Sequence, residues 1–359
     1  MRTNSFNSLS LNITIILSLL IYIQSQSNSI TDAKKHKPKK SCQSRPAKEN
    51  TWNLKSHSSG NNLINFFNFE TANDGSQGGI AKYVDLEEGY DSSMIGSNNG
   101  ALYFGVDTTP YSENRKSFRL SSKQTFSAGT LVVVDVLHMP ATCGSWPALW
   151  TVAKEAEWPQ QGEIDIIEGV NMFTQNSISV HTKPGFWMKS TGFHSKFMLD
   201  GDQQTNCDVA ATDDQGCGLR DTNQTSFGEP FNAAEGGVHV LEWTTDSISI
   251  YFFPRGKIPD DISSGYPSRS PSWGQPTAKF QGSGGQSTSD YFKDHVLVVN
   301  TNLCGKWPES IWNSDASYAG QPKSCAAITG HDTCQDFITN AGDKLDEAYW
   351  AIKSVKVYN

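Results

Sequence analysis

Short hydrophobic runs, several of them alternating with polar residues, follow one another along the chain from about residue 60. The clearest runs are residues 131–139, 163–170, 177–182, 247–254, 295–303 and 349–358. Ile248, Ile250 and Phe252 occupy every second position of one run, which is the period of a β-strand with one buried face. No hydrophobic pattern of helical period continues for twelve residues, although residues 331–340 favour one short helix.

The arrangement of these runs indicates an all-β protein. Many short strands without interleaved helices are typical of a β-sandwich or jelly roll and not of a parallel α/β sheet. A charged fraction of 18% and 30 glycines suit strands and loops better than a coiled coil or a disordered tail. Because no repeat and no change of composition is visible after residue 60, we predict one domain over residues 61–359.

The first 60 residues have a different character. Arg2 precedes the apolar run 13–23, which is short for a membrane span and matches the hydrophobic region of a secretory signal peptide. We therefore expect residues 1–26 to be a signal peptide and the protein to be secreted, extracellular or in a cell wall; an uncleaved anchor is the alternative. Residues 27–60 are rich in Lys and Pro and are expected to be a linker or pro-segment. For a secreted chain, the sequon at Asn223 predicts N-glycosylation.

Charge is unevenly distributed along the chain. Residues 1–48 contain eight Lys or Arg and one Asp, so the remainder has 21 basic and 36 acidic residues, a net charge of −15. An acidic body argues against a nucleic-acid partner and suits a neutral or cationic ligand. We expect a monomer that does not associate with a membrane after the signal is removed.

The chain has seven cysteines: Cys42, Cys143, Cys207, Cys217, Cys304, Cys325 and Cys334. Their spacing includes no CxxC pair and no Cys/His ligand pattern, which argues against a zinc site. We predict no metal ligands and no cofactor, the latter because the reaction expected below needs none. In a secreted protein disulfides are the default, and Cys207–Cys217 would close a polar loop. Two of the last three cysteines are expected to form another bond, and Cys42 is the candidate for the unpaired thiol.

Three acids, Glu163, Asp165 and Glu168, interrupt a run that otherwise has the composition of a buried strand, GEIDIIEGV. Side chains alternate between the two faces of a strand, so Glu163 and Asp165 share a face while Glu168 has the opposite parity. A β-bulge between Asp165 and Glu168 would return Glu168 to the shared face. Bulges recur beside active sites because they redirect a side chain.

Carboxyl groups on one open face have a chemical use. A retaining glycosidase needs two of them about 5–5.5 Å apart, one as nucleophile and one as acid and then base. Asp165, between the glutamates, would hydrogen-bond the nucleophile and help to order the pKa values. A calcium site and a merely solvated strand face are the alternatives, although calcium usually binds in flexible Asp/Asn/Gly loops rather than on an Ile-rich strand.

The sequence resembles glycoside hydrolase family 16, in particular the secreted fungal laminarinases, which are endo-β-1,3(4)-glucanases. The resemblance covers most of residues 62–359 and is carried by the E-x-D-x-x-E element and its flanks, by residues 138–150, 179–182, 250–262 and 302–307, and by the closing strand. It implies a β-jelly roll with an open substrate cleft on its concave sheet. By motif, Glu163 is the nucleophile, Asp165 its auxiliary and Glu168 the acid/base. This intact triad argues against the family's non-catalytic β-glucan-binding relatives.

Aromatic residues near the motif are candidates for sugar binding, because a ring can cover the apolar face of a pyranose. The resemblance assigns Trp158 and Trp307 to sugar subsites, with Trp146 as a further candidate. Trp150 is read either as a cleft residue or as core, and Trp350 is expected in the core.

Three polar residues complete the candidate site. The resemblance places His181 near the acid/base end, where it would bind a sugar hydroxyl or tune Glu168; a structural histidine is the alternative. Asn171 and Arg115 are candidates for gripping sugar hydroxyls, and Arg115 is equally consistent with a surface charge.

Together these features predict a secreted retaining endo-β-glucanase that hydrolyses β-1,3 and mixed β-1,3/1,4-glucans by double displacement, with β-glucan as its partner. A cell-wall transglycosylase, a non-catalytic β-glucan-binding protein and a structural protein tethered by the Lys-rich stretch are the alternatives. Extra aromatics in residues 180–197 and a Pro/Ser-rich loop at 266–276 leave the preferred glucan open.

Overall fold

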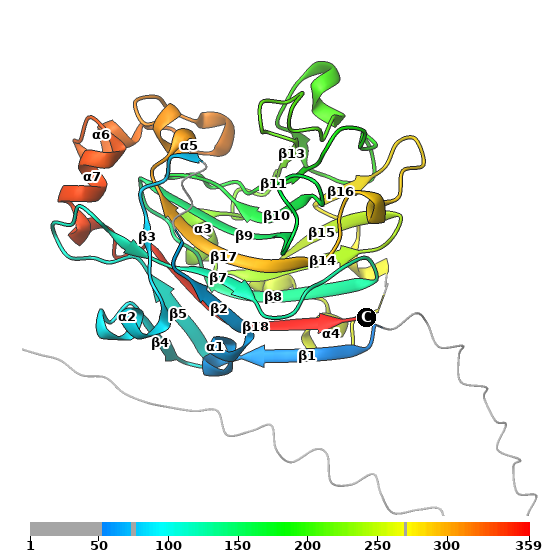
Figure 1. The fold of residues 1–359 in the computed structure, drawn as a ribbon, viewed down its shortest axis with the longest axis horizontal. Coiled ribbons are helices and arrows are strands. Elements are labelled where there is room, and N and C mark those ends of the chain that lie inside the picture. Colours follow the sequence, from blue (N-terminus) through cyan, green and yellow to red (C-terminus); the bar gives the residue numbers. More distant parts are fainter. Residues whose placement is uncertain (1–51, 73–76, 269–270) are drawn as a thin grey trace, which may run out of the picture. The chain divides into compact units, whose positions relative to one another are not determined.

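The computed structural model describes residues 52–72, 77–268 and 271–359 (Figure 1). The expected signal peptide, residues 1–26, and Cys42 lie outside the described residues. Within the described ranges, no helix has the length and apolar composition needed to cross a bilayer.

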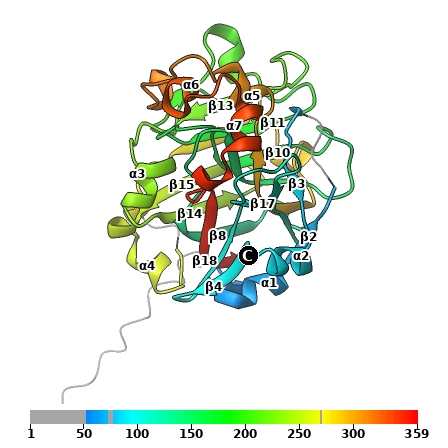
Figure 2. The same ribbon diagram turned by 90° about the vertical axis from the view of Figure 1, so that its left-hand side faces the viewer.

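Two eight-stranded antiparallel sheets make up the fold (Figures 1 and 2). Sheet 1 has the order β12 (Lys196–Phe197), β13 (Cys217–Arg220), β11 (Ser177–His181), β10 (Glu163–Glu168), β9 (Ser145–Ala153), β17 (His295–Leu303), β7 (Arg119–Ser122) and β2 (Phe67–Glu70). Sheet 2 has the order β16 (Ala278–Gln281), β15 (Ser247–Pro254), β14 (Gly237–Trp243), β8 (Thr130–His138), β18 (Tyr349–Tyr358), β5 (Ala101–Gly105) and β4 (Ile95–Asn98), with β1 (Leu54–Ser59) paired to β18. A separate parallel pair joins β3 (Lys82–Tyr83) to β6 (Lys116–Ser117).

The helices are short and lie in the connections between strands. The α-helices are α1 (Leu63–Phe66), α2 (Leu86–Asp91), α3 (Gly228–Ala233), α4 (Asp260–Ser263), α5 (Lys306–Ser310), α6 (Cys325–Thr329) and α7 (Cys334–Asn340). The 3₁₀ turns are η1 (Gly60–Asn62), η3 (Gly201–Thr205), η4 (Arg255–Lys257), η5 (Pro271–Trp273), η6 (Thr288–Asp290), η7 (Ser317–Ala319) and η8 (Gly342–Lys344). Helix α7 confirms the short helix expected within residues 331–340.

The core lies between the sheets and explains why the alternating runs form strands. Ile248 and Ile250 of β15 are fully buried, as is Ile164 of β10 in the facing sheet. Each buried aliphatic side chain of this size contributes about 1.5–3 kcal/mol to folding. The expected all-β sandwich is confirmed, and each of the clearest hydrophobic runs forms a strand at the same residues to within two positions.

The folded unit begins before residue 61. Strand β1, within the segment expected to be linker, pairs with β18 from Leu54 opposite Tyr358 to Ser59 opposite Ser354. Its sequence, LKSHSS, has no apolar alternation. The segment is nevertheless a strand, because it pairs with β18 through main-chain hydrogen bonds at the edge of the sheet. The expected boundary between linker and domain was therefore placed too late.

Three disulfide bonds join the described cysteines. Cys207–Cys217 is the pair expected to close the polar loop. Cys304, which follows β17, bonds to Cys334 at the start of α7, so the second expected bond also forms. The third, between Cys143 and Cys325, links residues 182 positions apart and was not foreseen. The last two bonds attach α6 and α7 to the same end of sheet 1.

Candidate active site

The pairing register of β10 shifts inside the acidic run. Asp165 lies opposite Ser179 of β11, whereas Glu168 lies opposite Ser177, so three steps along β10 correspond to two along β11. This is the predicted β-bulge, and it places Glu168 on the same face of sheet 1 as Glu163 and Asp165. The isoleucines of the run are buried on the opposite face.

The side chain of Asn176 fixes the bulge. Its Oδ1 accepts a hydrogen bond from the Glu168 backbone N–H at 2.9 Å, and its Nδ2 donates to the Ile166 carbonyl at 2.8 Å. The backbone N–H of Asn176 donates in turn to Ser226 Oγ. Because a bulge leaves main-chain groups without a cross-strand partner, this buried amide satisfies two groups that the ladder cannot.

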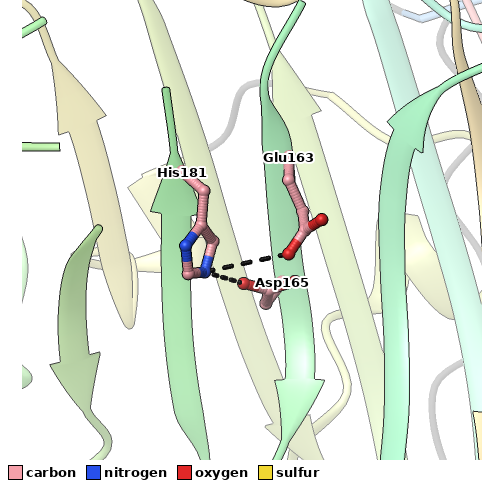
Figure 3. Close-up of side chains that lie close together, drawn as sticks. All are labelled: Glu163, Asp165 and His181. Atoms are coloured by element: carbon pink, nitrogen blue, oxygen red, sulfur yellow. Dashed lines mark hydrogen bonds and ion pairs between the residues drawn. The ribbon is translucent and has the colours of Figure 1, made fainter. Parts of the chain in front are cut away.

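Asp165 and His181 form the centre of the site (Figure 3). Asp165 Oδ2 accepts hydrogen bonds from Ser179 Oγ at 2.7 Å and from His181 Nε2 at 3.0 Å. His181 Nε2 also lies 3.8 Å from Glu163 Oε1. The expected hydrogen bond between Asp165 and the nucleophile is replaced by these two contacts.

His181 lies at a different end of the acidic row from the one expected. It pairs directly with Glu163 across β10 and β11, two residues beyond the Asp165–Ser179 pair and away from Glu168. The expectation that His181 lies near the acid/base end is therefore wrong. Glu168 pairs with Ser177, four residues from His181 along β11, because β10 and β11 run antiparallel from the Glu163–His181 pair.

An indole N–H holds each glutamate. Trp158 Nε1 donates to Glu163 Oε2 at 3.0 Å, and Trp146 Nε1 donates to Glu168 Oε1 at 2.8 Å. Trp158 remains 40% exposed, so its ring is accessible to a ligand beside Glu163. Two of the expected sugar-binding tryptophans thus contact the carboxyl groups directly.

The site environment raises the pKa values of both glutamates. Removal from water disfavours the charged form, and together with the negative charge of Asp165 it raises the pKa of Glu163 and that of Glu168 to about 8. The charge of His181 and the indole hydrogen bonds act in the opposite direction. Because the carboxyls influence one another, they titrate as a pair.

The His181 imidazole is held in its charged form. Removal from water would lower its pKa, but the hydrogen bond to Asp165 and the charges of the three acids outweigh this and raise the pKa to about 10. Ligand atoms of Glu163, Asp165 and His181 lie within 4.8 Å of one another, a spacing that would also suit a metal ion. In this structure His181 Nε2 instead lies 3.0 Å from Asp165 Oδ2 and 3.8 Å from Glu163 Oε1, so the three side chains form an ion-pair network.

A cluster of aromatic rings and one guanidinium group extends from Glu168. It is here called the Glu168-end cluster and consists of Trp146, Trp307, Phe173, Tyr318 and Arg220. The Trp146 and Trp307 rings meet edge to face at 5.7 Å between centroids, and Phe173 packs edge to face on both Trp307 and Tyr318. The Arg220 guanidinium lies 5.0 Å from the Phe173 centroid and 5.7 Å from that of Tyr318. Tyr318 is 61% exposed, so the cluster ends in an accessible ring.

Trp150 lies on the acid-bearing face and not in the core. It pairs with Asp165 across β9 and β10, and its Nε1 donates to Asn300 Oδ1 at 2.7 Å. The Arg119 guanidinium lies over its ring at 4.9 Å. Trp350, by contrast, is completely buried, as expected of a core residue.

Asn171 does not face a ligand. It is buried, its Oδ1 accepts from the Gly144 N–H, and its Nδ2 donates to the Pro308 carbonyl. Its φ of 55° is left-handed, a conformation that asparagine tolerates better than most residues. Its assignment to sugar binding is corrected to a structural role in joining two loops.

Arg115 is also a structural residue. It is 1% exposed, and its guanidinium donates to the carbonyls of Asp107, Thr109, Ile338 and Thr339. With its donors directed at main-chain carbonyls, it serves neither as a sugar ligand nor as a surface charge. Four carbonyls around one guanidinium explain why a buried arginine is tolerated here.

Several residues of the site were not found from the sequence: Asn176, Ser179, Arg220 and Tyr318. Strand pairing brings Ser179 and Arg220 to the acids, whereas Asn176 and Tyr318 lie in connections that only the complete fold places there. Asn223 lies in the loop between β13 and α3, where its Oδ1 accepts from the Thr225 N–H and hydroxyl. Its glycosylation stays a prediction.

Comparison with known proteins agrees with this geometry. Residues 67–358 match the family described as "XgeA-like, catalytic GH16 domain", and the chain therefore belongs to glycoside hydrolase family 16. It is 36% identical over 305 residues to an endo-1,3(4)-beta-glucanase of Arthroderma benhamiae, covering 83% of this chain and 63% of that relative. The chain spans between 41% and 70% of the length of seven other curated relatives.

Two solved structures share the fold. Laminarinase 16A from Phanerochaete chrysosporium, solved with two β-glucans in both donor and acceptor sites, is 32% identical with a TM-score of 0.75. An elongating family 16 β-1,3-glucosyltransferase is 35% identical, also with a TM-score of 0.75. Each alignment covers 86% of this chain and 100% of the other. These matches confirm the expected jelly-roll fold.

Proposed function

We propose that this chain is a retaining endo-β-glucanase that hydrolyses β-1,3 and mixed β-1,3/1,4-glucans by double displacement. The observation that carries the proposal is the bulge, which places Glu163 and Glu168 on one face, each held by an indole N–H. The name of the Arthroderma benhamiae relative supports the reaction, and the two β-glucans bound to laminarinase 16A support the substrate class.

In the first step the Glu163 carboxylate attacks the anomeric carbon while protonated Glu168 donates its proton to the glycosidic oxygen. The bond between that carbon and oxygen breaks, the shortened glucan leaves as an alcohol, and the remaining sugar is esterified to Glu163. In the second step water attacks the same carbon, Glu168 now accepts the water proton, and the ester breaks to restore both residues.

The surroundings of the two glutamates support this division of roles. Asp165 raises both pKa values, which favours a proton on one member of the pair at neutral pH. The positive His181 ring lies 3.8 Å from Glu163 and pairs with it across the strands, so it favours the ionised form of that residue. Glu163 is then the ionised nucleophile, and Glu168 keeps the proton.

The test distinguishes the two roles by the stereochemistry of rescue. Azide and an aryl β-laminaribioside, which needs no acid for departure, are given to Glu163→Ala and to Glu168→Ala. The first variant should form the α-azide by a single displacement, and the second the β-azide by attack on the ester. The opposite assignment of products would reverse the roles, and inactivity of the wild type on every β-glucan would leave only a binding function.

Transglycosylation is a second candidate, because the elongating family 16 glucosyltransferase is 35% identical. The Glu168-end cluster supports it, since a sugar stacked there would lie on the side from which an acceptor replaces water. Products longer than the starting oligosaccharide, followed over time, would establish transfer.

Secretion also belongs to this proposal. The apolar run at residues 13–23 and three disulfide bonds among the described cysteines support an oxidising compartment. Detection of the protein in the medium or cell-wall fraction, with a mature N-terminus near residue 27, would test it.

A further inference from the structure

A row of stacked rings lies on the outer face of sheet 2. Tyr103 of β5 and Tyr349 of β18 alternate along their strands with Phe104 and Trp350, which are buried between the sheets. The two tyrosines therefore point away from the core. In Figure 1, β4 and β5 lie below and to the left of β10, which carries the acids, and the two groups of strands belong to different sheets.

The rings of this row are held in place. Tyr103 and Tyr349 stack with centroids 6.0 Å apart, and Tyr349 stacks on His138 at 3.7 Å with 6° between the planes. His138 is fixed by contacts of its two ring nitrogens with the Tyr349 carbonyl and with Glu347. A ring that is already immobilised loses little entropy when it binds a ligand.

The neighbouring residue on β4 leaves this row open. Gly96 pairs directly with Tyr103, and a Cβ added to Gly96 would meet nothing within 4 Å. The strand order places β4 at the edge of sheet 2, so none of the described strands continues the sheet beyond Gly96. The absent side chain leaves space beside the tyrosine.

A groove of about 560 Å³ includes both tyrosines. Its other polar lining residues are hydroxyl- or amide-bearing, except one acid: Ser92, Ser93, Ser97, Asn98, Thr108, Thr109 and Asp107. The Asp107 carboxylate accepts hydrogen bonds from the Thr109 N–H and hydroxyl and lies 3.8 Å from the Arg115 guanidinium. With this charge compensated, the groove suits a neutral ligand that is rich in hydroxyl groups.

We infer that the groove at Tyr103 and Tyr349 is a second β-glucan-binding site, separate from the acids, in which a pyranose ring stacks on Tyr103, the outer ring of the row, and Tyr349 supports that ring from behind. A volume of this size is typical of small-ligand sites, and a flat aromatic ring covers the apolar face of a sugar while hydroxyl groups bind its edge. The choice of β-glucan among neutral sugars rests on the proposed function. Such a site holds an insoluble polymer to the protein while another stretch is cleaved.

The test uses the full chain with Glu163→Gln, so that a bound glucan is not cut. Titration calorimetry with laminarihexaose should detect a second, weaker oligosaccharide per chain, and adding Tyr103→Ala should remove only that one. Tyr103→Phe keeps the ring and should keep the site. Tyr266→Ala removes a tyrosine that is 78% exposed and outside the groove, and should change nothing.

A second measurement uses the otherwise wild-type chain. Loss of one stacked sugar weakens the binding free energy by about 1 kcal/mol, so Tyr103→Ala should cut insoluble β-1,3-glucan about fivefold more slowly. The same variant should cut soluble laminaripentaose at the normal rate. Unchanged stoichiometry in the titration, or equal rates on insoluble glucan, would overturn the inference. If no glucan is cut by any form, the proposed function fails, and the titration still reports on the groove.

Discussion

The backbone N–H of Glu168 is bonded to the side chain of Asn176, eight residues further along the chain. The same amide holds the Ile166 carbonyl on the other side of the bulge. The direction in which Glu168 points is thus set by a residue outside its own strand. Its carboxyl can keep the required position only while that amide remains in place.

Asn176→Ala should lower kcat about 10–100-fold with little change in KM. Loss of both hydrogen bonds lets the bulge relax, and displacement of a catalytic group by about 1 Å can cost a factor of this size. Steady-state rates on a soluble β-1,3-oligosaccharide would measure the effect.

Asn232 provides the matched control for this variant. Its amide likewise brackets a main-chain N–H and carbonyl, both of Met139, but away from the acids. Asn232→Ala should lower the unfolding temperature and leave kcat close to normal. Equal losses of kcat in the two variants would show that Asn176 has only a structural role.

Asp165→Asn should move the alkaline limb of the pH–rate profile to lower pH. The Asp165 charge raises the pKa of both glutamates, so its removal lowers both, and Glu168 loses its proton sooner as the pH rises. Loss of the positive charge on His181 would oppose this shift only in part, since Asp165 has the larger effect on each glutamate. A profile of kcat/KM that keeps its alkaline limb would contradict the assignment.

Glu168→Gln should make the protein more stable at about pH 8 than the wild type. A glutamate with a folded pKa of about 8 binds more protons when folded than unfolded, so wild-type stability falls as the pH rises from the unfolded value towards 8. A neutral glutamine does not incur this loss, and we expect a gain of about 2–4 °C in Tm at pH 8 and a smaller gain at pH 5. Calorimetric scans at both pH values would measure these gains in Tm. A larger gain at pH 5 than at pH 8 would contradict the raised pKa of Glu168.

The Cys143–Cys325 bond should contribute more to stability than Cys207–Cys217. The loops they close span 182 and 10 residues, and chain entropy gives about 5 and about 3 kcal/mol respectively. Urea unfolding of the two double Cys→Ala variants compares these contributions directly. A larger loss for the short loop would rule out the entropic explanation.

Tyr318→Ala should lower the ratio of transfer to hydrolysis about fivefold, because the exposed ring on the Glu168 side can stack an acceptor sugar but does not bind water. Chromatography of the products from laminaritetraose measures this ratio. Tyr111→Ala is the control, since Tyr111 is 60% exposed and lies outside the Glu168-end cluster. A matching change in both variants would remove Tyr318 from acceptor binding.

The sequence predicts those parts of the site that follow from a single strand. Alternation and the parity of Glu168 are local properties, and they were sufficient to predict the bulge and the shared face of the acids. The position of His181 depends on the register between two strands, which pairs it with Glu163 and not with Glu168. It could not be read from the order of residues along the chain.

Residues whose role depends on distant partners were misjudged. Arg115 looks like a ligand for sugar hydroxyls until the carbonyls of Ile338 and Thr339, more than two hundred positions away, surround it. Strand β1 has no hydrophobic alternation that predicts a strand, and it forms one only because it pairs with β18. In both cases the conformation is stabilised by contacts with residues far away in the sequence, which only the complete fold brings together.

Strand β18 also sets the order in which the protein can be assembled during synthesis. It lies between β8 on one side and β5 and β1 on the other, so these early strands have no partner connecting them to the rest of sheet 2 until residues 349–358 have been made. A ribosome-bound chain would leave the β18-facing edges of β5 and β8 unpaired up to that point, and unpaired strand edges make a partly folded chain prone to aggregation. A chain truncated before residue 349 would leave sheet 2 in separate pieces.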